Sequence, residues 1–134
     1  MKKVSLGEVI ESLDKESCRE ELLRICLSDR EEILKIIDQR TINNISKFFS
    51  AIANPLRLKI LLFLVQKPLP VCLLTKLLSV DQTLVSHHLR TLKEYNLVRV
   101  EARGRFRFYV YNEREAPQEI TFLLRSLLGA EVSV

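Results

Sequence analysis

The chain has 134 residues, of which 47% are hydrophobic and 28% charged, with a formal net charge of +4. This length corresponds to one compact domain with an extension and is enough to build a real core. Three glycines and four prolines exclude collagen-like and low-complexity proteins. No apolar run approaches the ~20 residues that span a bilayer, so we expect no membrane partner.

Charge is unevenly distributed along the chain. Residues 1–40 carry 8 basic and 10 acidic side chains, net −2, whereas residues 41–134 carry 13 and 7, net +6. The positive second part favours a polyanionic partner, although a solvated basic face has the same composition. The cysteines, Cys18, Cys26 and Cys72, are odd in number and lack framework spacing. With no secretory signal visible, we expect a reducing, cytoplasmic location.

The first segment, residues 1–40, is predicted to form two or three short amphipathic helices. Ser5 and Glu8 have the spacing of a capping box. Apolar residues at helical spacing follow them: Leu6, Val9, Ile10 and Leu13. These helices are acidic outside and apolar inside, so they must pack on another surface. Covering the main core, extending a dimer interface, binding an effector and recruiting a partner all remain open.

Two further helix starts are predicted in this segment. Asp14 can cap a second helix, whose inner side would hold Cys18, Leu22, Ile25 and Cys26. Asp29 and Glu32 repeat the cap spacing ahead of a third apolar group: Ile33, Ile36 and Ile37.

The middle of the chain begins with two helices. Residues 41–53 place apolar side chains at helical spacing: Ile42, Ile45, Phe48, Phe49 and Ile52. Asn54-Pro55 then gives a cap followed by proline at the first helical position, which predicts a helix to about Gln66. Its inward residues are Leu58, Leu61, Leu62 and Val65. Two prolines in residues 67–70 exclude a helix interior and predict a loop or a short edge strand.

A short helix at Val71–Leu78, a tight turn at Ser79-Val80 and a helix from the cap Asp81 to about Tyr95 follow. The inner face of the second helix is predicted to be Leu84, Val85, Leu89 and Leu92. Its outer face carries groups that can contact bases or phosphates: Gln82, Thr83, Ser86, His87 and Arg90. An ordinary solvated surface is the alternative, but Asp81 is the only acid in the first half of this helix.

After Tyr95 the pattern changes to period 2. Residues 97–101 predict a strand, residues 102–105 a turn and residues 105–111 a second strand of an antiparallel hairpin. Four arginines lie on it: Arg99, Arg103, Arg105 and Arg107. They suit a phosphate backbone or a minor groove, or else form a basic surface turn. Lys76, on the short helix, is a candidate phosphate contact or a solvated lysine.

Pro117 opens a last helix that we expect to stop at Gly129. Its apolar face consists of Ile120, Leu123, Leu124, Leu127 and Leu128. The order helix, helix, short helix, turn, helix and basic hairpin is that of a winged helix-turn-helix. We therefore expect a mainly α fold with a small antiparallel hairpin, a helical extension over residues 1–40 and a winged domain over residues 41–134. Helix 82–95 would lie in the major groove.

Two segments carry a family resemblance. They are Ala53-Asn54-Pro55-Leu56-Arg57-Leu58-Lys59-Ile60-Leu61 and Val85-Ser86-His87-His88-Leu89-Arg90-Thr91-Leu92-Lys93. With the hairpin following at the expected distance, the chain resembles the ArsR/SmtB family of prokaryotic winged-helix repressors over roughly residues 42–128. Because the family usually has a histidine at the second position of the pair, we interpret His88 as an orienting or phosphate-contacting residue.

The resemblance implies a homodimer that binds double-stranded DNA. The first and last helices of the domain would form the interface, although these faces also suit packing within one subunit. The implied interface residues are Ile45, Phe48, Phe49, Ile52, Ile120, Leu123, Leu124 and Leu127. Two recognition helices ~34–36 Å apart would require a pseudo-palindromic operator.

We expect no cofactor and no metal. One family metal site uses a Cys-Val-Cys-Asp run, whereas this chain has Pro70-Val71-Cys72-Leu73 and keeps a single thiolate. A second family site on the last helix needs a histidine that is missing here. The cysteines remain candidates for redox sensing, with small buried apolar residues as the alternative. Cys18 and Cys26 would lie ~12 Å apart on one helix, too far for a disulfide, which leaves pairs that involve Cys72.

The leading interpretation is a sequence-specific dimeric transcriptional regulator that acts as a repressor, with activation left open. It shows no phosphate-binding glycine loop and no nucleophile with a base, which argues against an enzyme. An architectural DNA-binding protein is one alternative and would show a steep salt dependence with little sequence preference. A winged-helix protein-interaction module is the other, and it would bury the Gln82–Arg90 face against protein.

Overall fold

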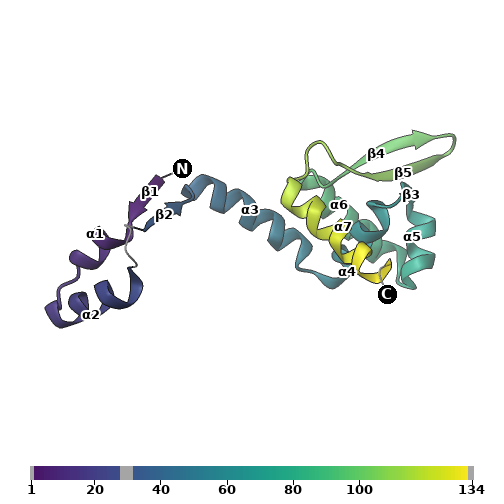
Figure 1. Ribbon diagram of the computed structural model, residues 1–134. Coiled ribbons are helices and arrows are strands. Elements are labelled where there is room, and N and C mark those ends of the chain that lie inside the picture. The colour runs from purple at the N-terminus through teal and green to yellow at the C-terminus, as the bar shows by residue number, and fades with distance from the viewer. Residues whose placement is uncertain (1, 28–31, 133–134) are drawn as a thin grey trace. The chain divides into compact units, whose positions relative to one another are not determined.

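The computed structural model describes residues 2–27 and 32–132 (Figure 1). The chain divides into two compact units, Met1–Asn43 and Asn44–Val134, here called the N-terminal unit and the winged-helix unit. Within the described residues, every helix is too short or too polar to cross a membrane.

The N-terminal unit contains β1 (Lys2–Ser5), α1 (Leu6–Glu11), α2 (Glu16–Cys26) and β2 (Ile33–Ile36). The two strands pair antiparallel, with Lys2 opposite Ile36 and Ser5 opposite Ile33. The Ser5 cap of α1 is confirmed, because the Ser5 hydroxyl accepts a hydrogen bond from the Glu8 amide at 3.3 Å.

Two predictions for this unit are wrong. Residues 33–36 form a strand instead of a third helix, because the segment finds its hydrogen-bond partner in β1, some thirty positions upstream. Helix α2 starts from Lys15 without a side-chain cap, so Asp14 does not serve as the predicted cap. The predicted cap Asp29 lies outside the described residues.

The winged-helix unit takes in most of α3 (Gln39–Ile52) and all of α4 (Pro55–Leu64), followed by β3 (Leu69–Pro70) and α5 (Val71–Leu78). After these come α6 (Gln82–Glu94), β4 (Val98–Arg103), β5 (Phe106–Tyr111) and α7 (Gln118–Val132). Two predicted caps are confirmed. The Asn54 side chain accepts from the Leu56 and Arg57 amides at 2.9 and 3.1 Å. The Asp81 carboxylate accepts from the Thr83 amide at 3.0 Å.

The sheet of this unit has the order β3-β5-β4, so residues 69–70 form the predicted edge strand. The hairpin β4–β5 projects away from the helices (Figure 1). Its turn is shorter than predicted, because Arg103 pairs with Phe106 and the loop is only Gly104-Arg105. Gly104 has φ of 60°, a conformation that glycine adopts without steric cost. Helix α7 continues through Gly129, so the predicted stop there is also wrong.

One core holds the winged-helix unit together. It draws buried side chains from α4, α5, α6, β4 and α7: Ile60, Leu61, Leu64, Leu74, Val85, Leu89, Leu92, Val98, Ile120 and Leu124. Leu84 was predicted to lie inside but is 43% exposed, and His88 occupies the inner face instead. Helix α4 ends at Leu64 with Val65 as its C-cap, just short of the predicted Gln66.

Candidate nucleic-acid interface

Helices α5 and α6 form a helix-turn-helix pair. Ser79 ends α5 in the left-handed conformation, with φ 54° and ψ 43°, which turns the chain sharply toward Asp81. The core residues Val85, Leu89 and Leu92 fix one face of α6 against the unit. The opposite face is therefore set by the helical period.

The structure brings all five predicted outer-face residues of α6 to the surface. Four of them are exposed and Ser86 is half-buried; the exposed ones are Gln82, Thr83, His87 and Arg90. The first turn has no acidic residue besides the cap Asp81, whose carboxylate is engaged with the Thr83 amide. This face offers hydrogen-bond donors and acceptors with a single free cation, Arg90, a chemistry that fits base edges and phosphates.

His88 is placed differently from its neighbours. Its side chain is 8% exposed and lies with Nδ1 3.4 Å from a terminal nitrogen of Arg57. Burial, the Arg57 cation and His87 all hold the pKa of His88 below its usual range. Since a guanidinium only donates, Nδ1 must accept, and the imidazole is neutral. The sequence left two roles open for His88, orienting the helix and contacting a phosphate. Its burial fits the orienting role.

Arg57 is a residue that the sequence reasoning missed. Its Nε donates to the Ala51 carbonyl at 2.5 Å, and a terminal nitrogen lies 3.5 Å from the Ser50 carbonyl. These carbonyls belong to the last turn of α3, where the Ser50 carbonyl also accepts from the Ala53 amide at 3.4 Å. Arg57 thus connects the end of α3 to the inner face of α6. The sequence signal that could have identified Arg57 is a basic residue one helical turn after the Asn54 cap.

The hairpin displays its arginines unequally. Glu101 accepts from Arg99 at 2.5 Å and from Arg103 at 3.0 Å, and these bonds lower the pKa of the Glu101 carboxyl. The Arg103 guanidinium also lies 4.9 Å from the centre of the Phe108 ring. Arg105 and Arg107 are exposed and form no ion pair with any described residue. The sequence prediction overlooked Glu101, which leaves these two arginines as the open cations of the hairpin.

The remaining candidates are at the surface. Lys76 is exposed in the last turn of α5, immediately before the turn into α6. All three cysteines are free and exposed, so the alternative of small buried apolar residues is wrong. Cys18 and Cys26 share α2, as the distance argument assumed. The described residues contain no cluster of three or more His, Cys, Asp or Glu side chains able to hold a metal.

The expected dimer residues divide into three groups by burial. Ile52, Ile120 and Leu124 lie in the core of a single chain. Ile45 and Phe48 are half-buried, and the Phe48 ring meets Tyr95 edge-on at 6.5 Å. The exposed members are Phe49, Leu123 and Leu127. Sequence reasoning missed Phe122, which is 76% exposed on α7.

Both the sequence and the fold of this chain are similar to those of known proteins. Residues 54–100 match the model of the bacterial regulatory protein, arsR family. A transcriptional repressor SmtB homolog from Synechocystis sp. is 33% identical over 103 residues, covering 70% of this chain and 76% of the relative. The chain belongs to the ArsR family. It is therefore a winged-helix DNA-binding regulator, and its family is one of regulators, not enzymes.

Solved structures of ArsR-type proteins agree with the fold. Reduced HlyU from Vibrio cholerae is 26% identical with a TM-score of 0.60, covering 66% of this chain and 90% of that one. The homodimeric winged helix-turn-helix domain of Mb0332 from Mycobacterium bovis is 22% identical with a TM-score of 0.56, covering 73% and 89%. The predicted winged helix-turn-helix fold class is confirmed.

Proposed function

We propose that this ArsR-family protein is a homodimeric, sequence-specific transcriptional repressor. Helix α6 lies in the major groove and the tip of the hairpin, residues 102–107, contacts the backbone or the minor groove. The observation that carries the proposal is the α6 face: four exposed hydrogen-bonding side chains beside Ser86, on a helix whose other face is locked in the core.

Each group of residues has a separate task in this proposal. On α6, Arg90 and His87 contact base edges, because an arginine reads guanine through two acceptors. Gln82, Thr83 and Ser86 complete the base and phosphate contacts near the start of the helix. Arg105 and Arg107 neutralise phosphates, since they carry no carboxylate partner among the described residues. Lys76 adds a phosphate contact, and buried His88 orients the helix.

A homodimer is supported by the apolar surface left on α3 and α7. Phe49 is 47% exposed, Leu127 is 41% exposed, and Leu123 and Phe122 add to the same kind of surface. Large exposed apolar residues of this kind mark interaction surfaces. A two-fold pair of α6 helices, ~34–36 Å apart, would read a pseudo-palindromic operator.

We further propose that residues 1–40 extend the dimer interface and that residues 41–134 form the DNA-binding domain. The support is the apolar surface of β2, whose Ile33, Leu34 and Ile36 are exposed. A two-stranded sheet needs further strands or a packing partner to be stable. A second copy supplies that partner in this proposal.

The DNA proposal is tested by fluorescence anisotropy with a duplex from the gene's upstream region, with excess random competitor at two salt concentrations. Arg90→Ala should cost about 1–3 kcal/mol for the specific duplex only, whereas Arg105→Gln should weaken all duplexes and reduce the salt slope by about one. Lys35→Gln, an equal charge change on exposed β2, is the matched control.

Other outcomes of this titration favour the alternative functions. Equal affinity for specific and random duplex favours an architectural protein. No duplex binding at moderate salt favours a protein-interaction module. Parallel titrations under reducing and disulfide-forming conditions test the cysteines, and equal affinity in both removes them as a switch.

The dimer is tested by sedimentation equilibrium. Phe49→Lys should weaken self-association by at least about tenfold, because it places a charge in an apolar contact. Leu73→Lys alters a similarly exposed apolar residue on α5 and should leave association unchanged. A chain starting at Asp38, whose carboxylate accepts from the Thr41 amide at 2.7 Å, keeps α3 intact. Unchanged association of that shorter chain would contradict the role given to residues 1–40.

A further inference from the structure

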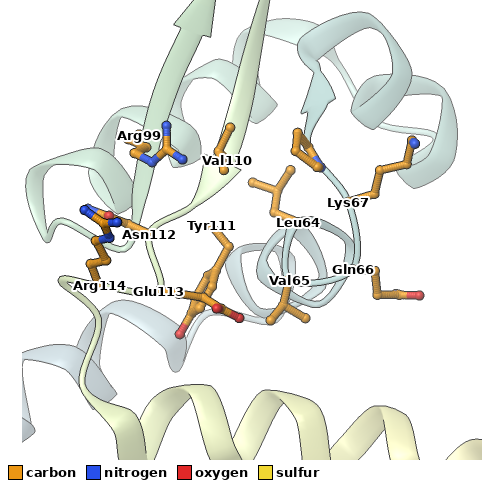
Figure 2. Close-up of a pocket in the computed structure, with 11 residues that line it drawn as sticks. Leu64, Val65, Gln66, Lys67, Arg99, Val110, Tyr111, Asn112, Glu113 and Arg114 are labelled. Carbon is orange, nitrogen blue, oxygen red and sulfur yellow. The ribbon is translucent and has the colours of Figure 1, made fainter.

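A hollow of about 380 Å³ lies at the base of the hairpin, away from the loop that carries Arg105. Its walls come from the end of α4, from β4 and β5, and from the segment that leads into α7 (Figure 2). Ligand sites of small molecules typically have volumes of this order, with apolar walls and a few polar groups. Of the arginines considered above for DNA contact, Arg99, which is ion-paired with Glu101, lines it, and no residue expected in the dimer face does.

The inner wall of this hollow is apolar. Leu64, Val65, Pro68 and Val110 line it together with Tyr111, whose ring points away from Val110 in Figure 2. The Tyr111 hydroxyl is hydrogen-bonded to the Thr121 hydroxyl at 2.6 Å, and burial raises the pKa of Tyr111. Because Leu64, Val65 and Tyr111 are buried in the core, the apolar atoms open to the hollow come from the half-buried Pro68 and Val110.

The rim of the hollow is cationic. Three basic residues line it, Lys67, Arg99 and Arg114, against one acid, Glu113. Glu113 is ion-paired with Arg125 of α7, so its charge is compensated. Arg99 shares Glu101 with Arg103 and keeps most of its donors unused. Lys67 and Arg114 form no ion pair with any described residue.

We propose that this hollow binds a small organic carboxylate with a compact apolar body. The apolar part lies against Val110 and Pro68, and the carboxylate meets Arg99 and Arg114, which stand on the same side of the hollow in Figure 2. Guanidinium and carboxylate groups match in geometry and form strong charge-assisted hydrogen bonds. An inorganic anion would satisfy the rim but leave the apolar wall uncovered.

The position of the site gives it a regulatory consequence, which rests on the proposed function. Arg99 is on β4, and Arg114 is in the segment between β5 and α7. A carboxylate that holds both arginines competes with Glu101 for Arg99. Glu101 is then left to Arg103, at the mouth of the hairpin loop. Occupancy therefore couples the hairpin to the start of the last helix and changes DNA affinity.

The binding is tested on the full chain with benzoate as the probe, followed by amide shifts in ¹H–¹⁵N spectra. Benzamide, which has the same ring without the charge, and inorganic phosphate, which has charge without a ring, are the comparison probes. Benzoate should shift the amides of residues 64–67 and 110–114 in a saturable way, and both comparison probes should bind at least about tenfold more weakly.

Two variants carry the same charge change at different places. Arg114→Gln should weaken benzoate binding about tenfold and leave DNA affinity without benzoate unchanged. Arg105→Gln should weaken DNA binding and leave benzoate binding unchanged. The two measurements separate the site from the proposed function, because benzoate binding is read without DNA.

Three outcomes overturn the proposal: no saturable shift with benzoate, equal binding of benzamide or phosphate, or unchanged benzoate affinity in Arg114→Gln. Saturable benzoate binding that depends on Arg114 supports the site even if the duplex measurements contradict the repressor. Duplex affinity that does not respond to saturating benzoate would remove the regulatory consequence alone.

Discussion

The two units differ in how they satisfy their apolar residues. In the N-terminal unit Ile10 is the buried hydrophobic residue among those described, while Ile25, Ile33 and Ile37 are more than half exposed. The winged-helix unit buries apolar side chains from five helices, α3 to α7, and from its sheet in one cluster. The hydrophobic core of this protein therefore belongs to the winged-helix unit. The apolar residues of the N-terminal unit are available for an interface.

The largest expected effect separates the cores of the two units. Leu89→Ala removes a fully buried side chain from α6 and should lower the free energy of unfolding by about 2–5 kcal/mol. Ile10→Ala removes the buried residue of the other unit and should leave the global urea midpoint nearly unchanged. Urea titrations followed by circular dichroism measure both. Equal losses of unfolding free energy in the two variants would show that both units unfold as one cooperative unit. The contrast between the two units would then be wrong.

The same contrast explains which parts of the fold were predictable. In the winged-helix unit the decisive signals are local: Asn54 before Pro55, Asp81 at the start of α6, and the change to period 2 after Tyr95. Each of these signals determines the local structure within a few residues of its own position. In the N-terminal unit, Ile33 and Ile36 have a spacing that also fits a helix. Only pairing with β1 decides for the strand, and that pairing is not visible locally.

The positions of side chains could be predicted where residues of one type follow the helical period. They could not be predicted where packing against another element decides whether a side chain is buried. The polar face of α6 followed from the helical period, whereas Leu84 was expected inside and is exposed. The guanidinium of Arg57 provides the partner that allows His88 to lie inside. The role of Glu101 in engaging two arginines depends on strand geometry, since residues 99, 101 and 103 share one face of β4.

A smaller difference between the two units is expected from the removal of their helix caps. Asn54→Ala removes a cap that accepts two amide hydrogen bonds at the start of α4, and it should lower the free energy of unfolding by about 1 kcal/mol. Ser5→Ala removes the cap of α1 in the other unit. Its cost should appear as faster amide hydrogen exchange in α1 without a shift of the global urea midpoint. A midpoint shift in Ser5→Ala equal to that in Asn54→Ala would contradict the separation of the two units.

The smallest effect uses pH, because both histidines of the chain lie on α6 of the winged-helix unit. Burial and the charges of Arg57 and His87 hold the pKa of His88 below its ordinary value of 6.5. The unfolded chain then takes up a proton before the folded chain does. Stability is therefore complete above about pH 6.5 and declines as the pH falls toward the lowered pKa of the folded state.

This decline should disappear when the buried imidazole is replaced. Between about pH 7.5 and about pH 5.5 the wild-type urea midpoint should fall, and His88→Gln should show a flatter profile over the same range. The exposed neighbour provides the control, since His87→Gln should keep the wild-type decline. Parallel profiles for wild type and His88→Gln would show that His88 does not titrate differently in the folded and unfolded states. Because the decline should follow global unfolding while the amide protection factors in α1 stay constant, the measurement also assigns the pH sensitivity to the winged-helix unit.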